Sequence, residues 1–573
     1  MKHVFLSVTV VALAACQPMA MGPMPVQPSV LREALPVSGT ALVEEGFGEA
    51  VSGYMRGVTA DMAGDNGPAA QGYLTALMDD TENANLKSRV FELALVEGDM
   101  ATAVRLARTM PARTGDTMPV LVRVVGALHE GNMALAQTEL QAVSKVAPDL
   151  LQISLINAYL NVAQGGSVAK HVAAVEALKG PQPQEARKQY HIARMWMYVP
   201  DEGKAVQALE ASNALEPGSL FTTLMLADMY HKRGATSQAV ALYNVFRTKN
   251  AYVALLEDEA ARIAQGYTVV ETTPNVKHDV ALTLFDFGLL VWSQGAVVPA
   301  RQLLAQALYL DPTNPYMLYY AGIVDESARA YAAAMAKYSQ IPENSPVALA
   351  ARIRQAEATF RSGQQAEGVA MAKQLVAKRP DVQGFQRSLA EMAFDSRDYS
   401  TALKAYDTLL KSQSNATPPA MLAAMYFARG ATYERLGQTE QAGQDLSLSL
   451  ILNPVNPSVL NYLAYMWVDK GIHLNEATAM LERAHEAAPE DGAIMDSLGW
   501  AYYQQGQYDK ALPLLEQGAD ATPDDATVFL HLGDVHAKLR NMVSAQRYWR
   551  QGSMLLKPED DAAVRKALQN RVK

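Results

Sequence analysis

The sequence predicts an all-α solenoid, in which antiparallel helix pairs stack side by side along the chain. Three observations indicate it: a period of 34 residues near the C-terminal end, Gly and Pro at fixed places within each period, and one spacing between small residues and Pro that recurs along most of the 573 residues. Each pair in such an array covers only its neighbours, so a long chain extends as a row of pairs around a continuous core.

The period is clearest in the stretch from 493 to 545. Three pairs of residues lie 34 apart, namely Leu498 and Leu532, Gly499 and Gly533, and Ala511 and Ala545. Gly499 and Ala511 are small, as two helices that cross closely require. Gly506 suits the turn between these helices because a positive φ costs Gly little. Pro523 ends the second helix, since Pro cannot donate the helical hydrogen bond.

The same spacings extend the repeat toward the N-terminus. A small residue precedes a Pro by 12 positions at Ala136/Pro148, Ala205/Pro217, Ala300/Pro312, Ala330/Pro342, Gly368/Pro380, Ala442/Pro454, Ala477/Pro489 and Ala511/Pro523. A Gly precedes a small residue by five positions at Gly64/Ala69, Gly98/Ala103 and Gly234/Ala239. These spacings predict roughly thirteen or fourteen helix pairs between about residues 50 and 560.

Two features interrupt the repeat. Pro513 lies inside a second helix, where we expect a local bend. The stretch 251–279 loses the period, and "TVVETTPN" within it suggests a non-helical crossing. We therefore place a boundary near Thr272–Asn275, between an N-terminal array (46–270) and a C-terminal array (271–558); one continuous superhelix is the alternative. Residues 559–573 are expected to form a polar cap helix, because no further repeat would cover it.

The N-terminal residues 1–15 are expected to be an export signal. Lys2 precedes the apolar run "VFLSVTVVALAA", which is shorter than the about 20 residues that span a bilayer. The only cysteine, Cys16, follows in "LAAC" and can form neither an internal disulfide nor a structural metal site alone. Residues 16–45 are rich in Pro, Gly and Met, which predicts a flexible tether.

The "LAAC" motif resembles the lipobox of bacterial lipoproteins. This resemblance implies that Cys16 is acylated and that the chain is cut before it, which would anchor the protein to a membrane. Gln17, where an Asp would favour the inner membrane, suggests the outer membrane. An ordinary cleavable signal with a chance Cys is the alternative.

Composition and motifs argue against several functions. A net charge of −10 and no dense basic run disfavour nucleic-acid binding. No metal-protease, nucleophile-elbow or phosphate-loop motif occurs, so we expect no enzyme activity, cofactor or metal. His531 and His536 are five residues apart, off a common helical face, and we expect solvent-facing or groove-lining imidazoles there.

Residues 493–526 carry Gly499, Tyr502, Gly506, Tyr508, Ala511 and Pro523 in a pattern that resembles the tetratricopeptide repeat. The resemblance implies a right-handed superhelix whose first helices line a concave, partner-binding groove. The groove positions of the last three repeats are Asn461, Tyr465, Asp496, Trp500, Tyr503 and Asp534. Polar side chains there can bind a peptide backbone and aromatic ones can anchor it, and two acids should favour a neutral or basic segment.

Other aromatic residues have alternative interpretations. Trp500 and Tyr503 could instead pack against the neighbouring repeat. Phe285 and Trp292 fall on groove positions by the same count, just after the interruption. Trp549 lies on a second helix, where the repeat needs a bulky aromatic, and is expected in the core.

The overall layout resembles tetratricopeptide lipoproteins that present cell-wall hydrolases to carboxy-terminal processing proteases, especially in "LNYLAYMWVDKGIHLNEATAMLERA" and "PEDGAIMDSLGWAYY". This resemblance implies a periplasm-facing adaptor on the outer membrane, with a periplasmic serine protease and peptidoglycan hydrolases as partners. A pilotin-like assembly scaffold for a pilus, secretion or exopolysaccharide export machine is the alternative. The partner's identity and the oligomeric state, a homo-oligomer included, are left open.

Overall fold

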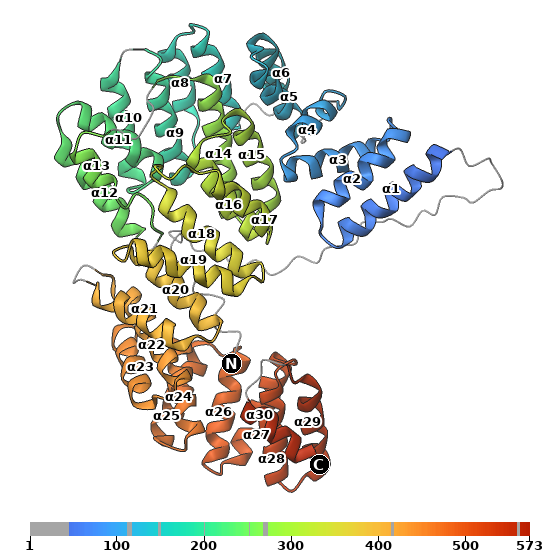
Figure 1. The fold of residues 1–573 in the computed structure, drawn as a ribbon, viewed down its shortest axis with the longest axis vertical. Helices are drawn as coiled ribbons and strands as arrows, with labels where there is room; N and C mark the ends of the chain where they lie inside the picture. The colour runs from blue at the N-terminus through green and yellow to red at the C-terminus, as the bar shows by residue number, and fades with distance from the viewer. Residues whose placement is uncertain are drawn as a thin grey trace. The chain divides into compact units, whose positions relative to one another are not determined.

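The computed structural model describes residues 45–111, 117–146, 150–199, 201–250, 253–267, 273–413, 417–557 and 562–572 (Figure 1). The predicted signal, Cys16 and nearly all of the tether lie outside these residues. All regular structure in the described residues is helical, which confirms the predicted all-α class. The chain divides into two compact units, Ala12–Phe385 and a second that begins at Gln386 and ends at Lys573.

The helices follow one another as antiparallel pairs. The pairs of the first unit are α1 (Glu45–Met62) with α2 (Asn66–Asp79), α3 (Ala84–Glu97) with α4 (Met100–Ala107), α5 (Met118–His129) with α6 (Met133–Val146), α7 (Leu151–Ala163) with α8 (Val168–Ala177), α9 (Gln182–Trp196) with α10 (Glu202–Leu215), α11 (Leu220–Lys232) with α12 (Thr236–Lys249), α14 (Val276–Ser293) with α15 (Val297–Leu310), α16 (Pro315–Ser327) with α17 (Tyr331–Ser339), and α18 (Ala348–Arg361) with α19 (Gln365–Lys378). The short helix α13 (Glu259–Ala264) stands between the sixth and seventh pairs.

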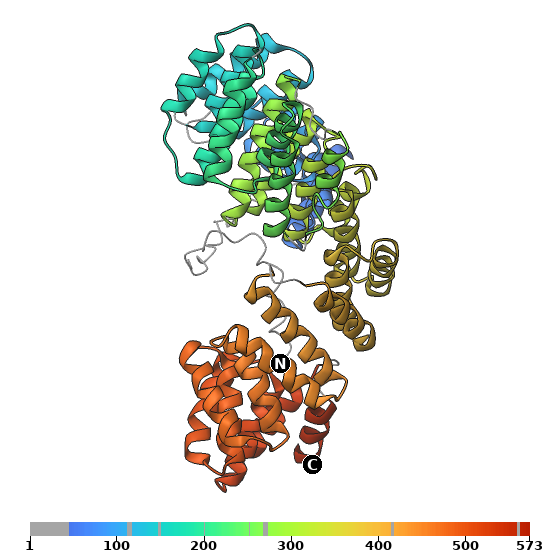
Figure 2. The same ribbon diagram turned by 90° about the vertical axis from the view of Figure 1, so that its left-hand side faces the viewer.

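The second unit continues the same arrangement (Figure 2). Its pairs are α20 (Gln383–Asp395), which crosses the division, with α21 (Tyr399–Lys411), α22 (Pro419–Arg435) with α23 (Thr439–Leu452), α24 (Pro457–Asp469) with α25 (Leu474–Ala487), α26 (Gly492–Gln504) with α27 (Tyr508–Ala521), and α28 (Ala526–Lys538) with α29 (Met542–Leu555). The final helix α30 (Ala562–Val572) packs on α29 and matches the predicted cap helix.

The turns inside the pairs have the predicted glycine chemistry. Gly506, between α26 and α27, has φ +74°, a left-handed conformation in which a β-carbon is strained. The Gly residues in the corresponding turns of other pairs are Gly64, Gly98, Gly131, Gly165, Gly234, Gly295, Gly363, Gly437 and Gly471, and all have positive φ. Three pairs use an arginine instead, Arg329, Arg397 and Arg540, also at positive φ.

The close crossing of paired helices is also confirmed. A β-carbon on Gly499 would lie 2.7 Å from Leu515 Cγ, and Ala511 across the pair is fully buried. The same contact recurs at Gly288 with Leu304, Gly322 with Tyr338, Gly430 with Leu446, and Gly533 with Trp549. Small residues at these places therefore set the distance between the helices of a pair.

Prolines end second helices as predicted, with one correction. Helices α10, α15, α23, α25 and α27 each end two residues before their Pro, as Ala521 does before Pro523. Pro513 lies inside α27, which continues through it. The spacing from Ala330 to Pro342 does not mark a crossing, because Ala330 precedes α17 and the small residue buried inside that helix is Ala334.

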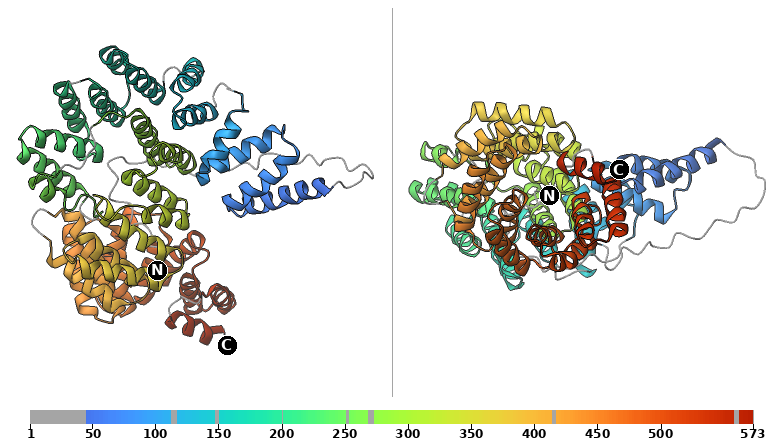
Figure 3. Two further views of the ribbon diagram at one scale, coloured as in Figure 1. Left: turned by 45° about the horizontal axis from the view of Figure 1, so that its top comes forward. Right: turned by 90° about the horizontal axis from the view of Figure 1, so that it is seen from below.

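In the first unit, the chain folds back on itself after the interrupted stretch. Helices α14 and α15 contact α3, α5, α7 and α9, the first helices of four earlier pairs, and Figure 3 shows them inside the arc of these pairs. Arg194 Nε of α9 donates to Asp279 Oδ1 of α14 over 2.8 Å, and both side chains are buried. After the interrupted stretch, α14 and α15 therefore pack against the inner side of the earlier pairs. The division between the two compact units comes later in the sequence, at Phe385.

Candidate functional site

The predicted groove residues lie on three successive first helices of the second unit. Helix α24 carries Asn461 and Tyr465, α26 carries Asp496, Trp500 and Tyr503, and α28 carries Asp534. The side chains of Asn461, Asp496 and Asp534 are buried, while the three aromatic residues are half-buried. Each helix packs on the next, so the set spans neighbouring repeats.

The aromatic residues of α26 stack in parallel with an imidazole of α28. The ring centroid of Trp500 lies 4.5 Å from that of Tyr503, with 8° between the planes, and 4.0 Å from that of His531, with 13°. Trp500 therefore packs against the neighbouring repeat through His531. Its indole remains half-buried, so one part contacts the core and another faces the surface.

His531 also forms an ion pair with Asp496. Its Nδ1 atom lies 2.9 and 3.1 Å from the two oxygens of that carboxylate. Burial by itself would lower the pKa of His531, but nearby carboxylates, Asp496 above all with Asp534 and Asp525, together raise this pKa above its usual value. The charge of Asp496 is thus balanced inside the protein.

The two histidines differ from the expectation. His531 is only 4% exposed and His536 only 8%, so a solvent-facing position is wrong for both. Successive first helices pack too closely to leave these rings in water. Burial lowers the pKa of His536, whose ring stacks on Tyr548 at 5.2 Å.

Asp534 is paired as well. Its carboxylate accepts a hydrogen bond from Trp549 Nε1 at 2.9 Å and two from Arg571 of α30, from Nε at 2.5 Å and Nη2 at 2.7 Å. Trp549 is buried, as predicted for a core aromatic. Each of the two acids of the predicted groove therefore has a basic partner within the chain.

The predicted surface contains two buried polar atoms with no hydrogen-bond partner, Asn461 Oδ1 and Trp500 Nε1. One is an acceptor and the other a donor. Buried polar groups usually have a partner, and an unpaired one costs free energy.

The upstream candidates lie in another environment. Phe285 of α14 is fully buried and meets Phe221 edge to face at 5.4 Å. A groove position for Phe285 is therefore wrong, because α14 folds against α7 and α9 and its side chains fill the core. Trp292 is half-buried and donates from Nε1 to Ser327 Oγ over 3.2 Å.

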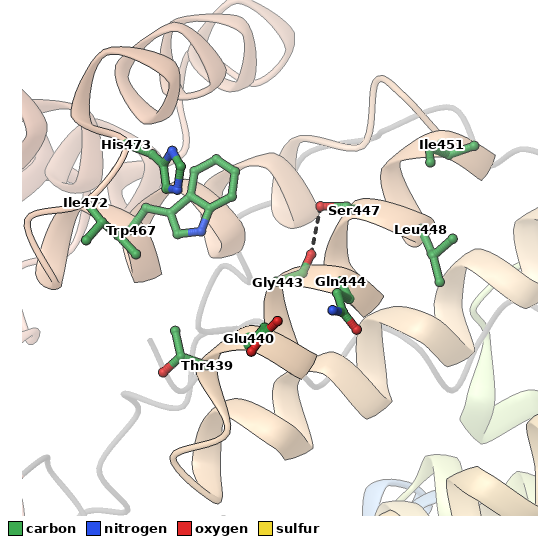
Figure 4. A pocket seen from close by; sticks show the side chains of 10 residues that line it. All are labelled: Thr439, Glu440, Gly443, Gln444, Ser447, Leu448, Ile451, Trp467, Ile472 and His473. Atoms are coloured by element: carbon green, nitrogen blue, oxygen red, sulfur yellow. Dashed lines mark hydrogen bonds between the residues drawn. The ribbon is translucent and has the colours of Figure 1, made fainter.

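An apolar pocket on the second unit was not anticipated from the sequence (Figure 4). It has a volume of about 790 Å³ and lies between one face of α23 and the turn from α24 to α25. Leu448 and Ile451 line it from α23, and Trp467 and Ile472 from the other side. Ile451 is 73% exposed. The signal for this surface in the sequence is the pair Leu448 and Ile451, which lie three residues apart on a second helix and are not needed by the repeat.

Among the described residues, no group of three or more His, Cys, Asp and Glu side chains is arranged to hold a metal ion. No helix in the described ranges is both long and apolar enough to cross a membrane.

Comparison with known families agrees with the repeat geometry. Models of the tetratricopeptide repeat match residues 353–417, 387–457 and 473–546. The "TPR repeat-containing protein PA4667" of Pseudomonas aeruginosa is 28% identical over 215 residues, which cover 37% of this chain and 35% of that protein. The "Bacteriophage adsorption protein A" of Escherichia coli is 27% identical over 212 residues, which cover 32% of this chain and 21% of that protein. The chain thus spans about a third or less of each relative's length.

Solved structures give more distant likenesses. The hetero-tetramer Cut9–Hcn1 of APC/C has a TM-score of 0.38 at 14% identity, over 91% of this chain and 96% of that one. A tetratricopeptide repeat protein from Parabacteroides merdae has a TM-score of 0.34 at 15% identity, over 51% of this chain and 99% of that one. Likenesses at this level carry no functional argument. The chain is thus a solenoid of helix pairs in which residues 353–457 and 473–546 match models of the tetratricopeptide repeat.

Proposed function

We propose that this chain is a non-catalytic adaptor of a bacterial envelope, which holds protein partners on the first helices α24, α26 and α28. The observation that carries the proposal is the half-buried aromatic surface of Tyr465, Trp500 and Tyr503 on these helices. Tetratricopeptide repeats bind protein partners, and rigid aromatic side chains anchor them at low entropic cost.

The packing of the first unit supports the choice of the second unit as the binding region. Helices α14 and α15 pack on the first helices α3, α5, α7 and α9 and so cover part of the surface that these helices would offer a partner. In the second unit, the corresponding aromatic side chains stay half-buried.

The proposed location is the periplasmic face of the outer membrane. It rests on the "LAAC" motif before Gln17, with acylation of Cys16 as the anchor. A Cys16→Ser variant should move from the membrane fraction to the soluble periplasmic fraction. A variant that still sediments with membranes would contradict acylation as the anchor.

The proposed partners are a carboxy-terminal processing protease and the peptidoglycan hydrolases that the adaptor delivers to it. Support comes from the resemblance of residues 460–503 to adaptors of this kind and from the partial match to a tetratricopeptide protein of Pseudomonas aeruginosa. The test is co-purification of the tagged full chain from detergent-solubilised envelopes. We expect a serine protease together with peptidoglycan hydrolases. Recovery of secretin or polysaccharide-export subunits instead would favour the pilotin-like scaffold.

The surface itself is tested by substitution. In the double variant Tyr465→Ala and Tyr503→Ala, recovery of partners should fall about tenfold or more, because aromatic anchors carry much of the energy of an interface. Helical content by circular dichroism should stay near that of the wild type. Tyr548→Ala is the matched control, a half-buried tyrosine on the second helix α29. Equal loss in the control would refute the assigned surface.

A further inference from the structure

The carboxylate of Asp534 holds an arginine from the end of the chain. Arg571 of α30 donates to Asp534 Oδ1 from Nε at 2.5 Å and to Oδ2 from Nη2 at 2.7 Å. This two-point contact matches the planar fork of a guanidinium, which a lysine ammonium cannot reproduce.

Trp549 completes the arginine site. Its Nε1 donates to Asp534 Oδ1 at 2.9 Å, which fixes the orientation of the carboxylate. The guanidinium carbon of Arg571 lies 6.0 Å from the centroid of the Trp549 ring, at the outer limit of a cation–π contact. Acid and indole are both buried, so the receiving side of the contact is rigid.

The site lies in line with the proposed binding surface. Asp534 has the place on α28 that Trp500 has on α26 and Tyr465 has on α24. Tyr503 lies close enough that Asp534, after burial, contributes to its raised pKa. A partner segment that follows the aromatic residues from α24 to α28 therefore ends at the carboxylate of Asp534.

Helix α30 is held by an apolar contact in addition to Arg571. Leu568 is fully buried and packs with Trp549, whereas the Arg571 side chain is 36% exposed. The guanidinium can therefore leave Asp534 while Leu568 keeps the helix in place.

We propose that Asp534 and Trp549 form an arginine-binding pocket for a partner protein, and that Arg571 of the chain itself occupies the pocket and competes with the partner's arginine. This inference rests on the proposed function, because it adds an arginine to the segment that the surface binds. While Arg571 fills the pocket, the arginine of a partner cannot bind there. The apparent affinity for that arginine therefore falls in proportion to the fraction of protein whose pocket is empty.

The experiment uses the full chain in detergent and the probe acetyl-Ala-Ala-Arg-Ala-Ala-amide, with the citrulline peptide as its neutral analogue. Isothermal titration should show that Arg571→Gln binds the arginine peptide about tenfold more tightly than the wild type. The citrulline peptide should bind both proteins equally weakly. Adding Asp534→Asn to Arg571→Gln should abolish the gain. The matched control is Lys566→Gln, an exposed cation on the same helix, which should behave as the wild type.

Three results would overturn the pocket. The first is an unchanged or weaker affinity of Arg571→Gln for the arginine peptide, and the second is no binding of that peptide to any variant. The third is an equal gain in Lys566→Gln, which would indicate that net charge alone raises the affinity. Arg571→Lys keeps the charge without the fork and should show a smaller gain, which tests the site should Arg571→Gln unfold. If Tyr465→Ala with Tyr503→Ala lowers partner recovery while the peptide results fail, only the arginine pocket falls. If that double variant keeps its partners, the proposed binding surface falls instead.

Discussion

His531 takes its charge and its position from three neighbours on the previous repeat. Asp496 pairs with its Nδ1 atom, Trp500 stacks on its ring at 4.0 Å, and Tyr503 stacks on Trp500. The contacts of His531 with Asp496 and Trp500 join two neighbouring repeats, whereas Tyr503 and Trp500 stack within α26. The role of His531 could not be predicted from the histidines alone, because its partner Asp496 lies 35 residues earlier in the sequence.

The pairing of His531 predicts how stability depends on pH. Because the folded pKa of His531 is raised above its unfolded value of about 6.5, the Asp496–His531 pair contributes its full stability below about pH 6.5. That contribution is lost as the pH rises through the folded pKa. Urea unfolding of the second unit, followed at a series of pH values, should show this decline. His531→Gln should flatten it, and an unchanged slope would exclude His531 as the source.

Gly499 illustrates a constraint on size at a single position. A β-carbon there would meet Leu515 Cγ at 2.7 Å, so Gly499→Ala should lower the free energy of unfolding by about 1–3 kcal/mol. Gly443→Ala, in the middle of α23, is the control: its nearest atom would be Met466 Cε at 4.0 Å. That variant should be stabilised by about 0.5–1 kcal/mol, because Ala favours the helix. Chemical denaturation measures both variants. Stabilisation of both alike would mean that helix propensity, not crowding at Gly499, dominates.

At the scale of an element, the turn between paired helices decides where each pair begins and ends. The turn needs one residue in the left-handed conformation, and most pairs place Gly there. The pair α28–α29 instead places Arg540 at φ +60°. The helix pair forms without the glycine because packing of the two helices outweighs the local strain.

Arg540→Gly should therefore stabilise the second unit. Relief of the left-handed strain should raise its free energy of unfolding by up to about 1 kcal/mol, less the added entropy of Gly in the unfolded chain. Arg550→Gly, an exposed position inside α29, is the matched control and should lower it by about 1 kcal/mol. Thermal denaturation by circular dichroism compares the two variants. A loss of stability in Arg540→Gly would show that the arginine side chain matters more than its backbone conformation.

At the scale of the whole molecule, the return of α14 and α15 onto the first helices determines which surfaces are available. The return depends on buried polar contacts between residues far apart in sequence. Arg194 and Tyr198 both donate to Asp279 of α14, and His191 lies 3.1 Å from Asp286 of the same helix. A satisfied polar network of this kind favours one arrangement of packed helices over others.

Removing Asp279 should destabilise the first unit selectively. Asp279→Ala leaves the buried Arg194 without its anion, which should cost about 3–5 kcal/mol. Arg108→Ala is the control, since its pair with Glu130 is about half exposed and should contribute only about 0–1 kcal/mol. Calorimetry of the full chain should show a lower transition for the first unit and an unchanged one for the second. An unaffected first unit would mean that apolar packing alone holds α14 in place.

The sequence by itself determined the helix pairs, because their signals are local: a Gly takes most of the turns, a small residue permits the close crossings, and a Pro follows several of the second helices. It also singled out the successive first helices that carry Tyr465, Trp500 and Asp534. Only the tertiary structure decided which of these helices stay open. Phe285 is core because α14 folds onto α9, and Asp534 is paired because Arg571 reaches it from α30. Such contacts join separate helices across many residues, and no period in the sequence encodes them.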